Sequence, residues 1–155
     1  MRRVVFDRKD EVMRFVARLT GESRYDGCST IGLEKDGEIV AGIVYQGHNG
    51  PNILMHFAVE GSRHLISPAF VCAAFMYPFQ VLQCNRVTGL VRTDNVGAQV
   101  LDEHLGFVRE GVMREGAGDR EDFIMYGMLE RECRFLRGRY FAALQRELGR
   151  SAIAV

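Results

Sequence analysis

The segment Asn52–Glu60 (NILMHFAVE) constrains the fold of this chain more than any other. It is apolar at nearly every position, which is typical of a central strand that is covered on both faces. A helical segment, Pro68–Leu82, follows it, and then a second strand-like segment, Arg86–Arg92. Two strands joined by a crossover helix run parallel when they share a sheet, so we expect a parallel pair at the centre of the fold.

Turn signals and hydrophobic periodicity predict further elements on both sides of this crossover unit. Asp36-Gly37 is a strong hairpin signal, and Gly106 stands where glycine commonly ends a helix. The predicted elements are strand Arg2–Phe6, helix Asp10–Leu19, strands Ser29–Glu34 and Glu38–Tyr45, helix Asn95–Leu105, strands Phe107–Glu115 and Glu121–Leu129, and helix Glu130–Leu148. The predicted fold class is α/β (α+β): a mixed, mostly antiparallel sheet of about seven strands with helices on both faces and a C-terminal helix.

Several residues carry local signals for helix ends. Asp10 is expected to cap the first helix. Ser67 is a favoured N-cap and Pro68 a favoured first residue of the crossover helix. Pro78 should kink that helix or end it near Tyr77, because proline has no N–H to donate.

The chain has 155 residues, which suits one domain over residues 1–155, with residues 130–155 as a C-terminal helical extension. Its formal net charge is zero, so the composition gives no sign of a nucleic-acid partner. No apolar run approaches the roughly 18 residues that a membrane-spanning helix needs. The cysteines form no C-x-x-C pair and the histidines lack metal-ligand spacing, so we expect a reduced, cytoplasmic protein without a metal.

The loop Gly61–Ser67 joins the first parallel strand to the crossover helix. Ligands favour the carboxyl ends of parallel strands, and the N-terminus of a helix offers free N–H groups and a positive dipole end. These two tendencies predict an anion site at this loop.

The segment from Asn95 to Arg114 carries a longer pattern: Asn95, Ala98, Leu-Gly-Phe at 105–107, and Glu110-Gly111-x-x-Arg114. This string resembles a segment common in GNAT (GCN5-related) N-acetyltransferases of the ribosomal-protein-acetylating RimJ/RimL kind. The order of strands and helices over about residues 1–130 is similar to the GNAT fold as well. The resemblance implies a transferase that moves an acetyl group from acetyl-CoA to a primary amine, on a protein N-terminus or on a small molecule.

The resemblance also implies a place for the acyl-CoA, between the two parallel strands where they splay apart. Its pyrophosphate is then expected on the backbone of the loop residues Gly61, Ser62, Arg63, His64, Ile66 and Ser67. Aligned on Arg63, the two small positions of the family's loop pattern are occupied by Ile66 and Pro68. Isoleucine does not easily adopt a positive φ and proline has no N–H, so Arg63 and Ser67 are expected to compensate through their side chains.

Strand Asn52–Glu60 carries the catalytic candidates. Alternation places His56 and Glu60 on the same face of the strand. The resemblance implies a general base on this strand, and His56 suits that role; a partly buried histidine that is satisfied by a neighbour is the other interpretation. A backbone N–H within 57–59 is implied to stabilise the oxyanion, from one of Phe57, Ala58 and Val59.

Two residues near the next helix complete the implied site. Asn95 is implied to contact the pantetheine or the phosphates of CoA, and its position alone predicts a helix N-cap. Asp102 stands where many members of the family have a tyrosine that protonates the departing thiolate. An ionised aspartate is a poor acid at neutral pH, so we expect the proton to come from elsewhere, or its donation to matter little because a thiolate is a tolerable leaving group.

Three classes of function remain open at this point. The first is an N-acetyltransferase, and the second is a binding or regulatory module with a GNAT fold that has lost efficient turnover, as the altered loop and missing tyrosine suggest. The third is a nucleic-acid-modifying enzyme, suggested by the arginines of the C-terminal segment alone. We expect acceptor specificity in the loops Thr20–Gly27 and Gly116–Arg120. The apolar stripe of the last helix should pack on the protein's own sheet or on a second copy in a homodimer.

Overall fold

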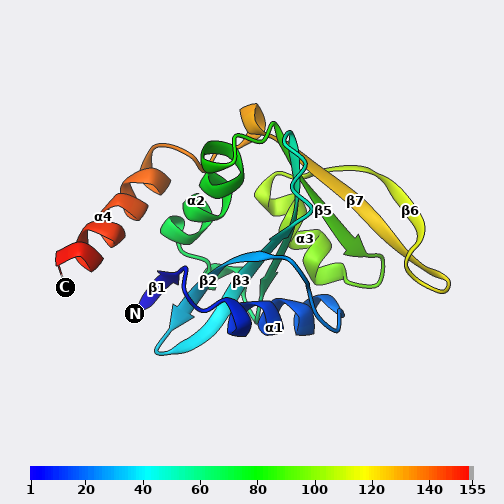
Figure 1. Ribbon diagram of the computed structural model, residues 1–155, viewed down its shortest axis with the longest axis horizontal. Coiled ribbons are helices and arrows are strands. Elements are labelled where there is room, and N and C mark those ends of the chain that lie inside the picture. Colours follow the sequence, from blue (N-terminus) through cyan, green and yellow to red (C-terminus); the bar gives the residue numbers. More distant parts are fainter. Residues whose placement is uncertain (154–155) are drawn as a thin grey trace.

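The computed structural model describes residues 1–153, and the side chains of residues 1–150. The strands form one seven-stranded sheet in the order β1-β2-β3-β4-β5-β7-β6. β4 and β5 pair in parallel and the other neighbours pair antiparallel, which confirms the predicted mixed sheet with a parallel pair (Figure 1). The elements are β1 Arg2–Val5, α1 Lys9–Thr20, β2 Ser29–Lys35, β3 Glu38–Gln46, β4 Asn52–Val59, α2 Pro68–Met76, β5 Arg86–Arg92, α3 Val96–Leu105, β6 Val108–Gly118, β7 Glu121–Leu129 and α4 Arg139–Ile153.

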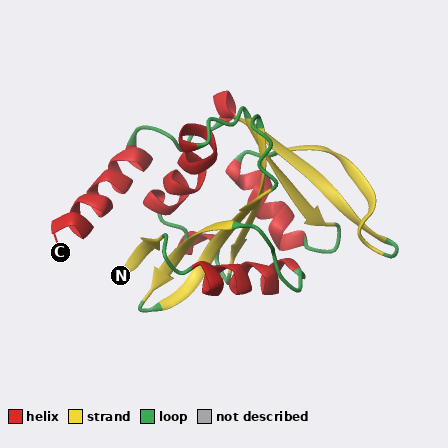
Figure 2. Ribbon diagram, in the orientation of Figure 1, coloured by secondary structure: helices red, strands yellow, loops and turns green. Residues whose placement is uncertain are grey.

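Helices cover both faces of the sheet (Figure 2). α1 lies on one face of β2–β4, where a Cβ added at Gly42 of β3 would come within 2.8 Å of Val12 of α1. A glycine in the strand therefore lets the helix approach the sheet closely. The larger core lies on the other face, where α2 and α3 bury residues such as Phe70, Phe75 and Leu101.

The parallel strands β4 and β5 separate after a short paired stretch. Their register runs from Asn52 opposite Arg86 to Leu54 opposite Thr88. Beyond Leu54 the edge of β4 that faces β5 has no ladder partner. The other edge of β5 stays paired with β7 as far as Arg92. An open wedge thus begins at the middle of the sheet.

The start of α1 corrects one expectation. The helix begins at Lys9 with Arg8 as its N-cap and no side-chain cap, so Asp10 lies inside the first turn instead of capping it. Arg8 forms ion pairs with Glu11 and Glu34, which tie the helix entry to β2. Asp10 still helps the helix, because an acidic residue in the first turn interacts favourably with the helix dipole.

The crossover helix is shorter than predicted. α2 ends at Met76 and continues as one π-helical turn, Tyr77–Val81, instead of running as one helix to Leu82. The change falls beside Pro78, as the missing N–H of proline predicts. Within the turn, the amide of Leu82 donates to the carbonyl of Tyr77 at 3.0 Å, the wider spacing of a π-helix.

The C-terminal segment departs further from the prediction. A 3-10 turn, Glu130–Glu132, leads into an irregular stretch over residues 133–138, and α4 begins only at Arg139. Arg134 donates to the carbonyls of His104 (2.9 Å) and Leu105 (3.1 Å) at the end of α3, and Gly138 has a φ of +63°. These contacts hold the stretch against α3, so Cys133 and Leu136 reach the core without being helical.

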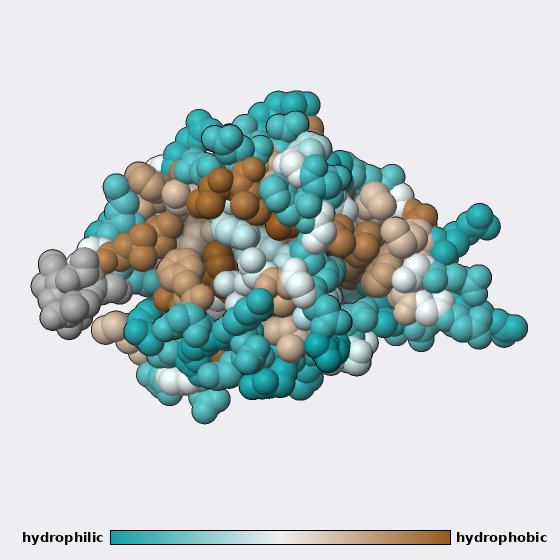
Figure 3. All heavy atoms as spheres, in the orientation of Figure 1, coloured by the Kyte–Doolittle hydropathy of each residue, from teal (hydrophilic) through white to brown (hydrophobic). Residues whose placement is uncertain are grey.

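The apolar stripe of α4 packs partly on α2. Leu144 is buried in the main core, whereas Leu148 remains half exposed. Figure 3 shows apolar side chains gathered between α4 and the first strands, over an apolar groove that also includes Phe6, Ile31 and Tyr77. Whether a second copy covers this groove stays a prediction. Within residues 1–153, no helix is both long and apolar enough to cross a bilayer.

Candidate active site

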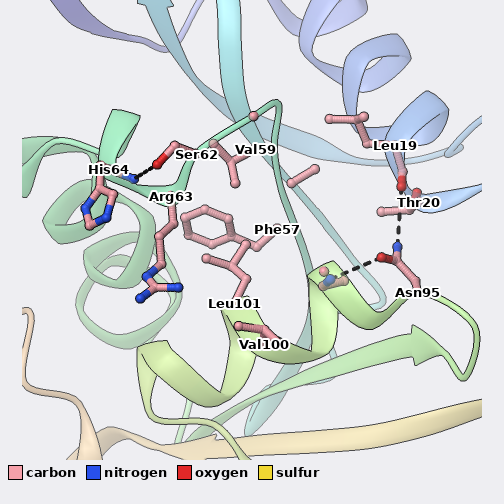
Figure 4. A pocket seen from close by; sticks show the side chains of 14 residues that line it. Leu19, Thr20, Phe57, Val59, Ser62, Arg63, His64, Asn95, Val100 and Leu101 are labelled. Atoms are coloured by element: carbon pink, nitrogen blue, oxygen red, sulfur yellow. Dashed lines mark hydrogen bonds between the residues drawn. The ribbon is translucent and has the colours of Figure 1, made fainter.

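A cleft of about 500 Å³ opens where β4 and β5 separate (Figure 4). Its walls come from the end of β4, the loop that follows it, the end of α1 and the first half of α3. The lining residues are Leu19, Thr20, Phe57, Ala58, Val59, Gly61, Ser62, Arg63, His64, Asn95, Gly97, Ala98, Val100 and Leu101. The structure therefore brings together most of the residues that the sequence singled out for cofactor binding.

The backbone of β4 presents polar groups to this cleft. The amide of Glu60 donates to Val40 of the strand before, at 3.1 Å. Because hydrogen-bonding directions alternate along a strand, Ala58 also faces β3, and the amides of Phe57 and Val59 face the open edge. Two N–H groups are thus available to an oxygen atom inside the cleft.

The loop after β4 uses several of its own amides. Residues Arg63–Leu65 form a 3-10 turn in which the amides of His64, Leu65 and Ile66 donate to Ser62 Oγ, Ser62 O and Arg63 O at 3.0–3.1 Å. An amide that already donates inside the turn is not free for a phosphate. The Arg63 side chain instead points beside Phe57 into the cleft (Figure 4).

The start of α2 shows how the two departures from the family pattern are accommodated. Pro68 is the first helical residue, and Ser67 caps the helix by accepting from the amide of Phe70 at 3.2 Å. Ile66 has an ordinary negative φ of −67°, so the backbone there avoids the left-handed region that glycine would allow. Ser67 and Ile66 line a neighbouring hollow, not the cleft itself.

Asn95 caps α3, as its position predicts. Its Oδ1 accepts from the amide of Ala98 at 3.1 Å, and its Nδ2 donates to the carbonyl of Leu19 at 3.4 Å (Figure 4). The residue thereby ties the start of α3 to the end of α1 across the mouth of the cleft.

A second hollow, of about 420 Å³, lies on the α1 face of the sheet. The two loops from which the sequence predicted acceptor specificity meet there, because Thr20–Asp26 supplies one wall and Gly116 and Ala117 of the β6–β7 hairpin another. The lining residues are Thr20, Glu22, Arg24, Tyr25, Asp26, Gln46, Leu54, His56, Leu90, Gly116, Ala117 and Phe123.

His56 is buried between these spaces and is already satisfied. Its ring stacks on Tyr25 with 4.6 Å between ring centroids, and its Nε2 lies 3.1 Å from Gln46 Oε1. Since an amide oxygen accepts, Nε2 carries the proton and Nδ1 is the free ring nitrogen. Burial lowers the pKa of His56 to about 4, so the ring is neutral at pH 7 and is a weak base.

Glu60 lies elsewhere. Its side chain is 55% exposed, and its two carboxylate oxygens accept hydrogen bonds from the two terminal nitrogens of Arg18, each at 3.2 Å. It lines neither the cleft nor the second hollow, so the structure does not bring it together with His56. An exposed ion pair of this kind contributes little to stability and leaves the carboxylate in solvent.

A small, partly enclosed space of about 20 Å³ lies between the cleft and the second hollow. Phe57, Asn95 and Ala98 line both it and the cleft, and His56 and Leu90 line both it and the second hollow. Thr20 lines all three spaces. The small space therefore adjoins both larger ones.

Asp102 lines this small space and corrects the expectation of an ionised aspartate. It is 6% exposed, and its Oδ2 packs over the bare backbone of Gly89, 3.1 Å from where a Cβ would stand. Burial, and then the neighbouring charge of Glu103, raises the pKa of Asp102 to about 8. The carboxyl is thus mostly protonated at neutral pH and can donate a proton.

Sequence reasoning placed Thr20 and Tyr25 in a loop expected to set acceptor specificity but gave neither a contact, and it gave Arg92 no role beyond ending a strand. The hydroxyls of Thr20 and Tyr25 are 2.7 Å apart, and burial raises the pKa of Tyr25 to about 12. Arg92 binds Glu22 (3.2 Å) and Glu121 (2.7 Å), and its Nε is buried without a partner. A polar loop and a strand end carry no spacing that would have revealed these long-range contacts. Among the described residues, no group of His, Cys, Asp and Glu could hold a metal ion.

Comparison with known proteins finds likeness at the level of structure. No family model and no curated protein matches the sequence. A point mutant of the spermidine N-acetyltransferase SpeG from Vibrio cholerae matches with a TM-score of 0.61 and 16% identity, over 84% of this chain and 93% of that one. RimJ from Mycobacterium smegmatis, in complex with CoA-disulfide, matches with a TM-score of 0.57 and 19% identity, over 77% of this chain and 60% of that one.

A third structure, described as a probable acetyltransferase, matches with a TM-score of 0.53 and 24% identity, over 68% of this chain. The chain spans 62% of that protein's length, which is less than two thirds. These likenesses show that the chain has the acetyltransferase (GNAT) fold.

Proposed function

We propose that this protein is an N-acetyltransferase that moves the acetyl group of acetyl-CoA to a primary amine. The observation that carries the proposal is the small space that adjoins both the cleft and the second hollow. A thioester held in the cleft and an amine held in the second hollow would face one another there, and positioning of this kind removes much of the entropic barrier to reaction.

The cleft suits the pantetheine arm of CoA. It lies along the open edge of β4, with apolar walls from Phe57 and Leu101 and two amides of β4 that face it. An amide-containing arm can bond to such an open strand edge as a further strand would. The amide of Phe57 or Val59 then donates to the thioester oxygen and stabilises the oxyanion that forms on attack.

The chemistry is a direct transfer. The neutral amine attacks the carbonyl carbon, a C–N bond forms, and the C–S bond then breaks with its electron pair on sulfur. Asp102 donates its proton to that sulfur as CoA leaves, and the proton released by the amine restores the carboxyl through the small space or solvent. A protonated carboxyl suits this role better than an ionised one.

The acceptor that fits best is an amine that is already largely neutral near pH 7–8. His56 has a pKa of about 4 and a partner on Nε2, so it offers little driving force for taking a proton from an ammonium group. An α-amine has a reference pKa of about 7.7–8.0, compared with about 10.4 for a lysine side chain. We therefore favour a protein N-terminus or a small amine of similar basicity. Four buried free thiols fit a reducing, cytoplasmic setting.

A non-catalytic binding module is the second candidate, because the loop after β4 uses amides inside its own 3-10 turn. Titration of the protein with acetyl-CoA and with CoA by calorimetry tests both. We expect micromolar binding, followed by CoA release when a peptide with a free N-terminus is added. Binding without transfer to peptide, spermidine or lysine acceptors would favour the module, and no binding up to millimolar concentration would contradict both.

A further inference from the structure

A third hollow, of about 310 Å³, adjoins the cleft on the side away from the acceptor. Both spaces share Arg63, His64 and Leu101, so a long ligand can pass from one to the other. Its other walls are the start of α2, the end of α3 and the C-terminal segment. The remaining lining residues are Ile66, Ser67, Pro68, Val71, His104, Leu105, Arg134, Phe135, Arg139 and Tyr140.

This third hollow gathers positive charge in a protein whose formal net charge is zero. Its lining includes three arginines, Arg63, Arg134 and Arg139, and no carboxylate lines it among the described residues. Nine ion pairs bind charged groups elsewhere in the described part of the chain, and none of them involves the three arginines of this hollow. Uncompensated cations around a concave surface favour a ligand with several negative charges.

The C-terminal segment also brings guanidinium planes to the same place, supported by the ring of Tyr140 and by the buried ring of Phe135, which packs on Phe75. Arg134 lies 4.4 Å above the ring of Phe135, and Arg139 lies 4.6 Å from the ring of Tyr140 while donating to its hydroxyl at 2.9 Å. Arg–aromatic pairs of this kind can stack on a flat base as well as neutralise a phosphate. The exposed guanidinium groups of Arg134 and Arg139 thus offer a cation for a phosphate and a flat face for a base.

We propose that the C-terminal segment completes the cofactor site, with Arg139, Arg134 and Arg63 binding the 3′-phosphorylated nucleotide end of CoA in the third hollow. The inference rests on the proposed function, because it assumes that the pantetheine arm occupies the cleft. It also accounts for the loop after β4, whose amides donate within the 3-10 turn and are not free for a phosphate. Arginine side chains would bind the phosphates in place of these amides. Arginine suits this task because its guanidinium can bind a phosphate through two N–H groups.

The test compares CoA with 3′-dephospho-CoA, which lacks only the terminal phosphate, by calorimetry at low salt. We expect the wild-type protein to bind CoA about tenfold more tightly. Arg139→Gln should weaken CoA binding about fivefold and leave dephospho-CoA binding unchanged, so the preference shrinks. Arg139→Lys should restore part of the preference for CoA over dephospho-CoA. Arg134 is not the residue to change, because it also holds the end of α3.

Arg146→Gln is the matched control, since it removes one positive charge from α4 at a residue that does not line the hollow. It should leave both affinities unchanged. Equal binding of CoA and dephospho-CoA by the wild type, or equal losses for both ligands in Arg139→Gln, would overturn the inference while leaving the proposed function intact. Failure of both ligands to bind at all would instead overturn the proposed function.

Discussion

The proposed cofactor side of the site, which consists of the cleft and the third hollow, differs from the proposed acceptor side, which is the second hollow. The difference lies in how their charges are arranged. On the cofactor side, Arg63 and Arg139 have no carboxylate partner in the described part of the chain. On the acceptor side, Glu22 is paired with Arg92 at 3.2 Å and Asp26 with Arg24 at 2.5 Å. Net charge therefore favours a polyanion in the third hollow, whereas the carboxylates that line the second hollow are paired within the protein.

The two sides also differ in origin. The cofactor side is built from the ends of regular elements: β4, α2 and α3. The acceptor side is built from the loop after α1 and the tip of a hairpin. Element ends are fixed by the sheet and the core, whereas loops vary more easily. If the cleft binds CoA and the second hollow binds the amine, as proposed, the acceptor can change while the cofactor site stays the same.

The largest expected effect comes from filling one side at a time. Ala98→Phe places a ring in the cleft. Overfilling of this kind should reduce the binding free energy of CoA by up to about 3 kcal/mol, which corresponds to a roughly 150-fold loss of CoA affinity. Ala117→Phe fills the acceptor side instead and should leave CoA affinity within about twofold while raising the KM of the amine. Calorimetry and steady-state kinetics on both variants check this, with thermal unfolding as the control for folding. Equal loss of CoA affinity in both would contradict the division into two sides.

Asp102→Asn tests the group between the two sides. The substitution keeps the shape and removes the ionisable proton, so kcat should fall about 100-fold while CoA affinity stays near that of the wild type. Wild-type activity should also decline above about pH 8, as the carboxyl ionises, and the residual rate of the variant should lack that decline. A variant with full activity would show that the thiolate leaves without this acid.

The same carboxyl affects stability in a direction that follows from its pKa. The folded state holds the proton up to about pH 8, and an unfolded aspartate loses it near pH 3.9. Between these values the folded state binds more protons, so this group makes the protein less stable as pH rises through that window. The melting temperature of Asp102→Asn relative to wild type should therefore increase from pH 5 to pH 8. A constant difference would contradict the raised pKa.

Arg63→Gln addresses the charge of the cofactor side. Removal of one exposed cation should weaken CoA binding about fivefold at low salt, and the loss should shrink as salt screens the site. Arg24→Gln is the matched change on the acceptor side and should leave CoA affinity unchanged. Equal effects from the two arginines would mean that overall charge, and not the local hollow, attracts the cofactor.

Sequence reasoning predicted the position of the cleft and the loops of the second hollow, but not the state of the buried ionisable groups between them, for a physical reason. The crossover unit and the Asn95 cap depend on local signals, so the parallel pair and the position of the cleft follow from them. The state of Asp102 depends on burial by α3 against Gly89, and the partners of His56 come from β3 and the loop after α1. Burial and long-range contacts of this kind leave no local pattern, which is why the sequence predicted an ionised aspartate and left His56 open.

His56→Gln has the smallest expected effect on activity and separates two explanations of this residue. If His56 only shapes the hollow, the substitution should lower kcat/KM with an α-amine acceptor about threefold. If His56 is a general base, the substitution should lower kcat/KM about 100-fold or more, above all with a lysine-type acceptor. Stability offers an independent check. The pKa of about 4 lies below the unfolded value near 6.5, so wild type loses stability as pH falls from 6.5 to 4, and the variant should lose less. A rate loss near 100-fold with an α-amine would restore His56 as the base and make the second hollow catalytic as well as selective.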